Sequence, residues 1–320
     1  MRAKIVLAGG HGFLGQILAV HFQQRGWDVV VLTRSPRTPR NATSRVQEAR
    51  WDGMTLGEWT SALEGATAVI NLAGVSVNCR YHARNQRLLM DSRIFPTRIL
   101  GEAIRHCTRP PKAWFNSSTA TIYKHTFGTA WDEDGEIGSH PDAKDAFSVA
   151  IATAWEREFE AAKTPATRKV ALRSAMVLGL GLNSVFPTLR RLARLGLGGT
   201  MAGGCQFVSW IHEADFCRAL DWLIEHEEIA GVVNLAAPGP VTNREMMTTL
   251  RGLCGMPIGL PATRWMLEMG AFVLRTETEL IIKSRRVVSK RLSDGGFTFR
   301  HRTMREAMAE LMQRSSNTGR

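Results

Sequence analysis

The N-terminal part of the chain alternates between short apolar runs and one segment of helical periodicity. Residues 4–8 and 29–32 form two mostly apolar runs of the kind that buried parallel strands show. Between these runs, apolar side chains recur at helical spacing from Phe13 to Phe22, and Gly26 ends the segment. The pattern predicts a strand–helix–strand unit whose glycines lie at the first strand-to-helix turn.

The same alternation continues through the middle of the chain. Apolar runs predict strands at residues 68–72, 113–117 and 170–178, and helical periodicity predicts helices at residues 83–106 and 149–162. Pro96 is expected to kink or break the first of these helices, because proline lacks the N–H that a helix interior requires. Strands that alternate with helices indicate an α/β fold. We expect a Rossmann-type doubly wound parallel sheet with a smaller C-terminal substrate lobe.

Glycines are frequent in the chain beyond residue 180, and this change in pattern predicts a second structural unit. We expect residues 1–180 to form the Rossmann domain, with strands at about residues 205–240 returning to it. Residues 181–320 would form the C-terminal lobe, which includes a helical segment at about residues 256–312. In the same part of the chain, Thr242 or Asn243 is expected to cap a helix.

Three glycines define the turn between the first predicted strand and helix. Gly9, Gly12 and Gly15 have the spacing of a dinucleotide-binding turn. In such a turn, one glycine permits the tight bend, one lets a pyrophosphate approach the backbone, and one allows close helix–strand packing. The helix N-terminus presents free N–H groups and a partial positive charge to the phosphates. A tight turn with no ligand is the alternative, but the strand–turn–helix–strand frame favours dinucleotide binding.

The end of the second predicted strand favours NADP(H) over NAD(H). A site for NAD(H) needs an acidic residue about 20 residues beyond the glycines, where its carboxylate binds the ribose 2′-hydroxyl. No acidic residue occurs from Val29 to Gln47. Thr33 and Arg34 occupy that place, with Arg37 close behind. A guanidinium there can pair with a 2′-phosphate. The alternative is that Arg34 faces solvent.

The net charge of +12 and the cysteine pattern limit the classes of function. The excess of Lys and Arg is spread over residues 34–50, 80–105 and 283–291, so solvated surface explains it better than nucleic-acid binding. The five cysteines are scattered without CxxC spacing, which argues against a disulfide framework and suits a reducing cytoplasm. No spacing suggests a metal site, and no apolar stretch is long enough for a membrane span. We expect a cytoplasmic protein with a small-molecule substrate that the sequence does not identify, and a homodimer is left open.

Several short motifs together resemble one enzyme family. They are Leu32–Pro36, Trp51–Asp52, Asn71–Gly74, Asp91–Arg93, Leu172–Gly179, Trp210–Asp215, Val241–Glu245 and Gly296–Phe299. With the glycine turn, they make the chain from Ile5 to about Leu311 similar to an extended short-chain dehydrogenase/reductase. More narrowly, it resembles the "epimerase family protein" branch (NAD-dependent epimerase/dehydratase-like), which carries a short C-terminal domain of unknown function.

The resemblance implies that residues 1–180 bind NADP(H), and it assigns a place to each contact residue. Gly9, Gly12, Phe13, Leu14 and Gly15 would hold the pyrophosphate, Thr33 and Arg34 the 2′-phosphate, Leu72, Ala73 and Gly74 the ribose. Arg93 would reach the phosphates, and Val177 would border the nicotinamide pocket. Asp52 would lie near the adenine, although a turn residue is an equal alternative.

The catalytic signature is where the sequence departs from the family. Such enzymes combine a Ser or Thr with Tyr-x-x-x-Lys, in which the tyrosine exchanges a proton with the substrate oxygen. Thr119, in the segment Ser117–Tyr123, matches the Ser/Thr position. Aligning the following helix on Trp155 places Ser148 at the tyrosine and Ala152 at the lysine. A serine hydroxyl is a poor proton donor beside a phenol, so the usual Tyr/Lys chemistry is absent.

Other candidates near the predicted cleft have weaker cases. Tyr123 lies four residues beyond Thr119 and could point into the same cleft, with a packed or surface tyrosine as the alternative. For His212 and Asp215, a buried, satisfied histidine and a carboxylate near a helix N-terminus are favoured over catalysis. Arg173 either binds an anionic substrate or ties two strands together. Thr119 and Tyr123 are therefore the catalytic candidates.

Three functions fit these patterns. The first is NADP(H)-dependent oxidoreduction, or epimerase/dehydratase-type chemistry, on a small carbonyl or sugar-like substrate. The second is a non-catalytic NADP(H)-binding sensor or scaffold, because the Tyr and Lys are missing. The third is nucleic-acid binding, which only the net charge suggests. The glycine turn supports cofactor binding and says nothing about turnover.

Overall fold

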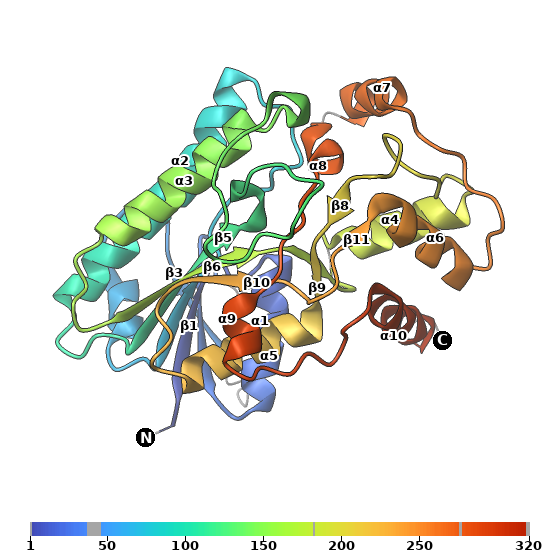
Figure 1. Ribbon diagram of the computed structural model, residues 1–320. Coiled ribbons are helices and arrows are strands. Elements are labelled where there is room, and N and C mark those ends of the chain that lie inside the picture. Colours follow the sequence, from blue (N-terminus) through green and yellow to red (C-terminus); the bar gives the residue numbers. More distant parts are fainter. Residues whose placement is uncertain (1, 37–45, 182, 275–276, 318–320) are drawn as a thin grey trace.

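A seven-stranded parallel sheet forms the centre of the structure (Figure 1). The computed structural model describes residues 2–36, 46–181, 183–274 and 277–317. The strands of this sheet are β1 (Lys4–Ala8), β2 (Asp28–Thr33), β3 (Val46–Arg50), β4 (Ala68–Asn71), β5 (Ala113–Thr119), β6 (Arg168–Ser174) and β10 (Gly231–Leu235). Their order is β10-β6-β5-β4-β1-β2-β3, so the chain reverses direction across the sheet beside β1. This is the doubly wound Rossmann arrangement that the alternation of strands and helices predicts.

Helices cover both faces of the sheet because its central strands are apolar on both sides. One face packs against α1 (Phe13–Gln24), α5 (Glu213–Glu225) and α9 (Lys290–Asp294). The other packs against α2 (Ala83–His106), α3 (Ala146–Ala161) and the short 3₁₀ helix η1 (Glu58–Leu63). Alternate residues of each strand point to the two faces, as in β1, where Leu7 packs on the face covered by α1 and α5, and Val6 on the face covered by α2 and α3.

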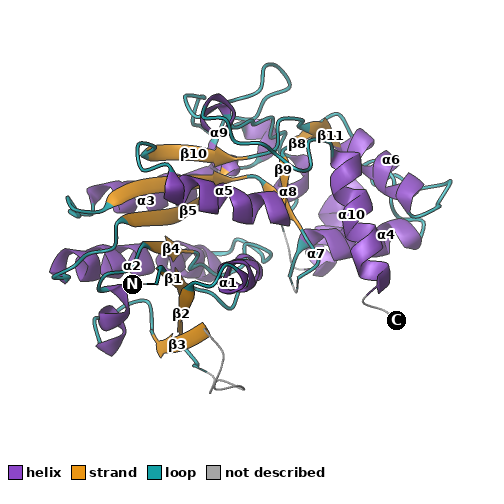
Figure 2. Cartoon of the chain, turned by 90° about the horizontal axis from the view of Figure 1, so that it is seen from below, coloured by secondary structure: helices purple, strands orange, loops and turns teal. Residues whose placement is uncertain are grey.

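A second apolar core lies at the carboxyl ends of the strands. It joins α4 (Val185–Arg194), α6 (Asn243–Leu253) and α10 (Met304–Asn317) to the short strand β7 (Met176–Leu178). Figure 2 shows the strands of the main sheet stacked from β10 to β3, with α4, α6, α7 (Arg264–Leu274) and α10 gathered at one end. Two small sheets, β8 (Phe207–Val208) with β11 (Val241–Thr242) and β7 with β9 (Trp210–His212), connect the two parts.

The last part of the chain contributes to both cores. Leu292 of α9, together with Phe297 and Phe299, belongs to the core of the main sheet. Met304, Met308 and Leu311 of α10 belong to the second core. Helix α8 (Glu279–Ile282) and the segment after it run beside the turn that follows β5. The C-terminal segment therefore contributes side chains to both cores.

Three details differ from the pattern-based predictions. Helix α2 continues through Pro96 without a break, and one residue later the Thr97 hydroxyl donates to the carbonyl of Arg93 at 2.8 Å. The predicted strand 170–178 is two strands, β6 and β7, because the chain leaves the main sheet at Ala175 to pair with β9. Strand β3 was not predicted, since as an edge strand with partly exposed residues it lacks an apolar run.

Candidate functional site

Each glycine of the N-terminal turn has a separate geometric task. Gly9 has a φ of +78°, and a Cβ there would lie 3.0 Å from the backbone of Ala73 at the end of β4. At Gly15 a Cβ would lie 2.4 Å from the Cα of Gly10, so this glycine lets α1 approach the turn closely. Gly12 is the N-cap of α1 and is exposed, and a Cβ there would meet only the Gly9 carbonyl oxygen, at 3.7 Å. The space above Gly12 is therefore open to a ligand.

The start of α1 fits an anion. Its N-cap makes no side-chain hydrogen bond, and its first turn, which begins with Phe13 and Leu14, contains no acidic residue. The first N–H groups of the helix are free of intrahelical partners and carry the positive end of its dipole. Leu72, Ala73 and Gly74 follow β4 directly, beside this turn, and the Ala73 N–H is fixed by the Asn71 side chain at 3.1 Å. The predicted pyrophosphate and ribose residues thus lie together at one edge of the sheet.

The carboxyl end of β2 is polar and basic. The exposed Arg34 follows Thr33, and residues 29–36 contain no carboxylate. The Thr33 hydroxyl lies 3.3 Å from His11 Nδ1, and the other ring nitrogen of His11 lies 2.8 Å from Glu48. Arg50 of β3 stands opposite Thr33 in the sheet register. Arg37 lies outside the described residues.

His11, Glu48 and Arg50 were missed by the sequence reasoning. Glu48 and Arg50 belong to the unpredicted strand β3, so nothing in the pattern placed them beside the end of β2. His11 occupies a variable position of the glycine turn. The structure adds a second arginine, Arg50, beside Thr33 in the register, and its guanidinium is of the kind that pairs with a 2′-phosphate.

Asp52 closes a turn of its own backbone. Its carboxylate accepts the N–H groups of Met54 and Thr55 at 2.8 and 2.9 Å and the Thr55 hydroxyl at 2.6 Å. The Thr55 hydroxyl, and then the two N–H groups, lower the pKa of Asp52. The turn alternative for Asp52 is therefore the one that the structure shows, and a contact to adenine stays a prediction.

Arg93 and Val177 flank the same edge of the sheet. The Arg93 guanidinium donates to the carbonyls of Leu89 and Val75 at 2.9 and 3.1 Å and lies over the ring of Trp155. It also lies 3.3 Å from where a Cβ of Gly74 would be, so it borders the predicted ribose residues. Val177 lies in β7, at the carboxyl-end side of β6.

Thr119 and Tyr123 differ in what their hydroxyls do. Thr119 is the last residue of β5 and is half-buried, and its oxygen accepts the N–H of Thr121 at 3.1 Å. That bond leaves its hydroxyl hydrogen available for a ligand. Tyr123 is 1% exposed, and its hydroxyl donates to Asn234 at 2.8 Å and accepts from Arg173 at 2.9 Å. Burial raises the pKa of Tyr123.

Arg173 ties elements together. Its guanidinium forms two hydrogen bonds with Glu156 of α3, at 2.9 and 2.7 Å, in a fully buried ion pair. Glu156 also accepts the hydroxyl of Ser118 of β5 at 2.5 Å. The pair therefore locks α3 against β5 and β6 beside the Thr119 turn, as in the structural alternative for Arg173.

His212 and Asp215 hold the N-terminal end of α5. His212 caps the helix by accepting the Ala214 N–H at 3.1 Å, and its other ring nitrogen lies 3.0 Å from Glu310 of α10. Asp215 is fully buried and accepts the backbone N–H groups of Arg300 and His301, each at 2.9 Å. Both residues have the structural roles that the pattern favoured.

The basic segment at residues 283–291 is not simply solvated surface. Lys283 is 1% exposed, forms an ion pair with Asp145 at 2.5 Å and donates to the carbonyl of Thr121 at 2.5 Å. Arg285 donates to the Thr121 hydroxyl at 3.2 Å. The surface interpretation is wrong for Lys283, because Asp145 provides the buried counter-charge that makes its burial tolerable. Charge spacing alone could not show this pairing across the sequence.

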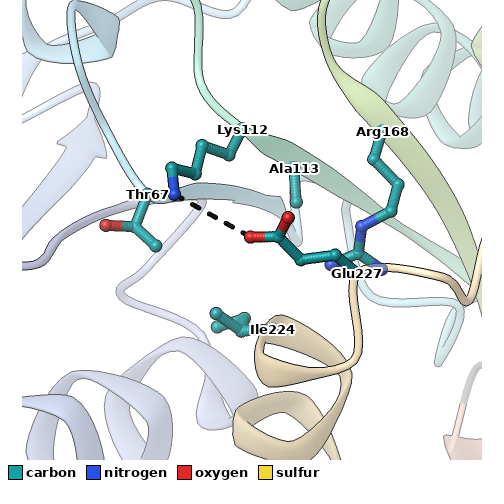
Figure 3. Close-up of a pocket in the computed structure, with 6 residues that line it drawn as sticks. All are labelled: Thr67, Lys112, Ala113, Arg168, Ile224 and Glu227. Carbon is teal, nitrogen blue, oxygen red and sulfur yellow. Dashed lines mark ion pairs between the residues drawn. The ribbon is translucent and has the colours of Figure 1, made fainter.

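A cavity of about 90 Å³ lies at the opposite edge of the sheet (Figure 3). Thr67, Lys112, Ala113 and Arg168, which stand at the amino ends of β4, β5 and β6, line it with Ile224 and Glu227. Lys112 and Glu227 form an exposed ion pair across it at 3.8 Å. Ligands of open α/β sheets bind at the carboxyl ends of strands, so this cavity is not the candidate site.

The profile of the NAD-dependent epimerase/dehydratase family matches residues 5–236. The chain belongs to this family. A second profile, a domain of unknown function designated DUF1731, matches residues 262–311 of the family member. The epimerase family protein SDR39U1 of Bos taurus is 30% identical over 315 residues, covering 97% of this chain and 99% of the relative. The epimerase family protein ML0860 of Mycobacterium leprae is 31% identical over 319 residues, covering 98% and 97%.

Solved structures support the family fold. The human epimerase family protein SDR39U1, solved with NADPH, is 26% identical to this epimerase/dehydratase-family chain with a TM-score of 0.83, covering 97% of this chain and 99% of that one. MoeE5, solved with UDP-glucuronic acid and NAD, is 20% identical with a TM-score of 0.75, covering 99% and 100%, and shows the shared fold alone. Among the described residues, no helix has the length and apolar character of a membrane span, and no cluster of three potential metal ligands occurs.

Proposed function

We propose that this family member binds NADP(H) and uses it in oxidoreduction, or in epimerase/dehydratase-type chemistry, on a small carbonyl or sugar-like substrate. The observation that carries the proposal is the end of β2, where the exposed Arg34 follows Thr33, Arg50 stands opposite Thr33 in the register, and residues 29–36 contain no carboxylate. A 2′-phosphate would find cationic partners there, whereas residues 29–36 offer the 2′-hydroxyl of NAD(H) no acidic partner. The human relative solved with NADPH supports this preference, and MoeE5 with NAD shows that the fold also serves NAD.

The residues of the turn fit the rest of the cofactor. The N–H groups at the start of α1, above the open face of Gly12, would hold the pyrophosphate. Leu72, Ala73 and Gly74 would line the ribose at the end of β4. When bound, the nicotinamide would supply or accept a hydride at the carboxyl end of the sheet.

Thr119 is the proposed substrate contact. It ends β5 at the same edge of the sheet, it is half-buried, and its hydroxyl hydrogen is available. A donated hydrogen bond to a substrate oxygen would hold the carbonyl in place and stabilise negative charge as it develops. Tyr123 remains a candidate, but its hydroxyl already donates to Asn234 and accepts from Arg173. It would therefore act indirectly, by positioning the turn that carries Thr119.

Replacement of Thr119 tests this proposal. We expect Thr119→Ala to lower the rate of NADPH oxidation by about 100-fold, within the range of general acid–base assistance, across a panel of aldehydes, ketones and nucleotide sugars. Thr119→Ser is the matched control and should retain most of the rate because it keeps the hydroxyl. The affinity for NADPH should be unchanged in both variants. Unchanged turnover in Thr119→Ala would show that Thr119 does not contact the substrate.

A non-catalytic sensor or scaffold is the second candidate function. It is supported by the prediction from the sequence that Ser148 and Ala152, both on α3, take the places of the family's Tyr and Lys. NADPH binding without turnover of any panel member would favour it. Nucleic-acid binding rests on the net charge of +12 alone and would require steeply salt-dependent binding to an oligonucleotide.

A further inference from the structure

Two polar side chains near the Thr119 turn have buried oxygens that make no hydrogen bond of normal geometry. Glu279 of α8 is 3% exposed, and among the described residues neither of its carboxylate oxygens makes a hydrogen bond of normal geometry. The hydroxyl of Tyr81 is likewise buried and lacks a hydrogen bond of normal geometry. Buried polar groups in folded proteins are nearly always bonded, because an unpaired one loses its hydration without compensation. A function is therefore the first explanation to test.

Ser148 lies beside both groups. Its hydroxyl stabilises the charged forms of Tyr81 and of Glu279, which places it between them. Ser148 is half-buried, whereas Glu279 is buried, so Ser148 is the accessible member of this cluster. The rings of Tyr81 and of Phe147, the residue before Ser148, meet edge-to-face with centroids 5.1 Å apart, which fixes the cluster against α3.

The accessible end of the cluster is close to the proposed substrate contact. Ser148 and Ala152 are one turn apart on the same face of α3. Ala152 is fully buried in a cluster with Ala120, the residue after Thr119. Lys283 and Arg285, which follow α8, are both bonded to Thr121 of the same turn. The turn, α3 and α8 are thereby held together around Ser148.

The charges around Glu279 suit an acid that releases its proton during a reaction. Burial raises the pKa of Glu279, and the negative charge of Asp145 adds to this rise. The Ser148 hydroxyl, Arg285 and Lys283 oppose it, because they stabilise the carboxylate. Burial thus favours the neutral carboxyl, whereas Arg285 and Lys283 stabilise the anion that forms when the proton leaves.

We propose that Glu279 supplies a proton to the substrate through the hydroxyl of Ser148, and that this pair replaces the absent tyrosine and lysine. The inference rests on the proposed oxidoreductase function. As a new C–H bond forms from the hydride at the carbonyl carbon, the π electrons of the carbonyl move to its oxygen. That oxygen takes the Ser148 hydrogen, and Ser148 takes the hydrogen of Glu279. Ser148 ends neutral, and Glu279 ends as a carboxylate that regains a proton from water through Ser148.

The C-terminal domain of unknown function acquires a role from this inference. Glu279, Lys283 and Arg285 all lie in residues 262–311, the part that this domain matches. Ser148 alone would be a poor acid, because a serine hydroxyl holds its proton tightly. With a carboxylic acid behind it, Ser148 never carries a charge.

Infrared spectroscopy of the cofactor-free protein tests the protonation of Glu279. We expect the wild-type protein at about pH 7 to show the C=O stretch of a buried protonated carboxyl, and Glu279→Gln to lack it. Glu277→Gln is the matched control and should keep the band. Glu277 is two residues away, but its carboxylate accepts the Tyr81 N–H at 2.8 Å and lies 3.8 Å from Arg80. A wild-type spectrum without the band overturns the inference, whatever the activity.

Kinetics test the transfer through Ser148. With NADPH and 4-nitrobenzaldehyde as the probe, Ser148→Ala and Glu279→Gln should each lower kcat by about 100-fold. The double variant should be no slower than either single one, because the two groups act as a unit. The wild-type rate should fall as pH rises and Glu279 loses its proton, and both single variants should lose this fall. Additive losses, or an unchanged pH profile in Glu279→Gln, would overturn the relay.

Failure of the proposed function and failure of the relay give different experimental results. A wild-type protein that shows the carboxyl band but does not bind NADPH would refute the proposed function. NADPH binding and turnover with no carboxyl band would refute the relay alone. NADPH binding and the band, without reduction of the probe or of any member of the carbonyl panel, would overturn the chemical step of the relay.

Discussion

The glycine turn shows how much depends on single Cβ atoms. Gly9 and Gly15 are required by the fold. Gly9 has a positive φ, and a Cβ at position 15 would overlap the Cα of Gly10. Gly12 is different, because its φ of −69° suits any residue and the space beside it is open. The glycine spacing in the sequence predicts a dinucleotide-binding turn. It cannot show which glycines the fold requires and which one leaves space for a ligand, because only the coordinates show what a side chain would meet.

Substitution of Gly12 should therefore separate binding from folding. We expect Gly12→Val to keep the wild-type melting temperature within a few degrees and to lose NADPH binding, because the side chain would occupy the approach of the pyrophosphate. Gly15→Ala is the contrasting variant and should lower the melting temperature, since its Cβ would overlap Gly10. Thermal unfolding and NADPH fluorescence measure the two effects. A folded Gly12→Val protein that still binds NADPH would mean that the turn is only structural.

At the scale of elements, the junction of α5 and α10 depends on one neutral histidine. His212 has a fully buried side chain that caps α5 and contacts Glu310 of α10. Burial, and then the positive charge of His301, lower the pKa of His212 from 6.5 to about 4. The unfolded chain takes up this proton near pH 6.5, whereas the folded chain resists it until about pH 4. Stability from this residue is present above pH 6.5 and is lost as the pH falls toward 4.

The pH dependence of unfolding should show this loss. At 1.36 kcal/mol per pKa unit, His212 accounts for about 3 kcal/mol of the decrease in unfolding free energy between pH 6.5 and 4. His212→Gln should be less stable at pH 7 and should lose less on acidification than the wild type. His106→Gln is the control, because this exposed histidine ends α2. Denaturant unfolding at several pH values measures the difference, and parallel curves for wild type and His212→Gln would contradict the account.

Much of the element order could be predicted from the sequence, and some of the site could not. Apolar runs located β1, β2, β4 and β5 because these strands are buried on both faces. The edge strand β3 has no such run, so Arg50 was not placed beside Thr33. Glu279 and Lys283 lie more than 130 residues from Ser148 and Asp145, and no local pattern reports a contact over that distance.

At the scale of the whole molecule, the C-terminal segment joins the two cores. It places Leu292 and Phe297 in the core of the main sheet, Met308 in the second core, and Lys283 in an ion pair with Asp145 between them. The glycine turn follows the carboxyl end of β1, and this segment is bonded to the turn that follows β5. We expect the cofactor at the glycine turn and the proton source at the C-terminal segment.

The affinity of the purified protein for NADPH and NADH tests the central claim most directly. A charged hydrogen bond is worth about 1.5–3 kcal/mol, so we expect NADPH to bind at least about tenfold more tightly than NADH. Arg34→Asp should remove this preference by weakening NADPH and should leave NADH nearly unchanged, because the carboxylate repels only the 2′-phosphate. Titration by nicotinamide fluorescence gives both dissociation constants. Equal affinity of the wild-type protein for the two cofactors would contradict the assignment of the β2 end to the 2′-phosphate.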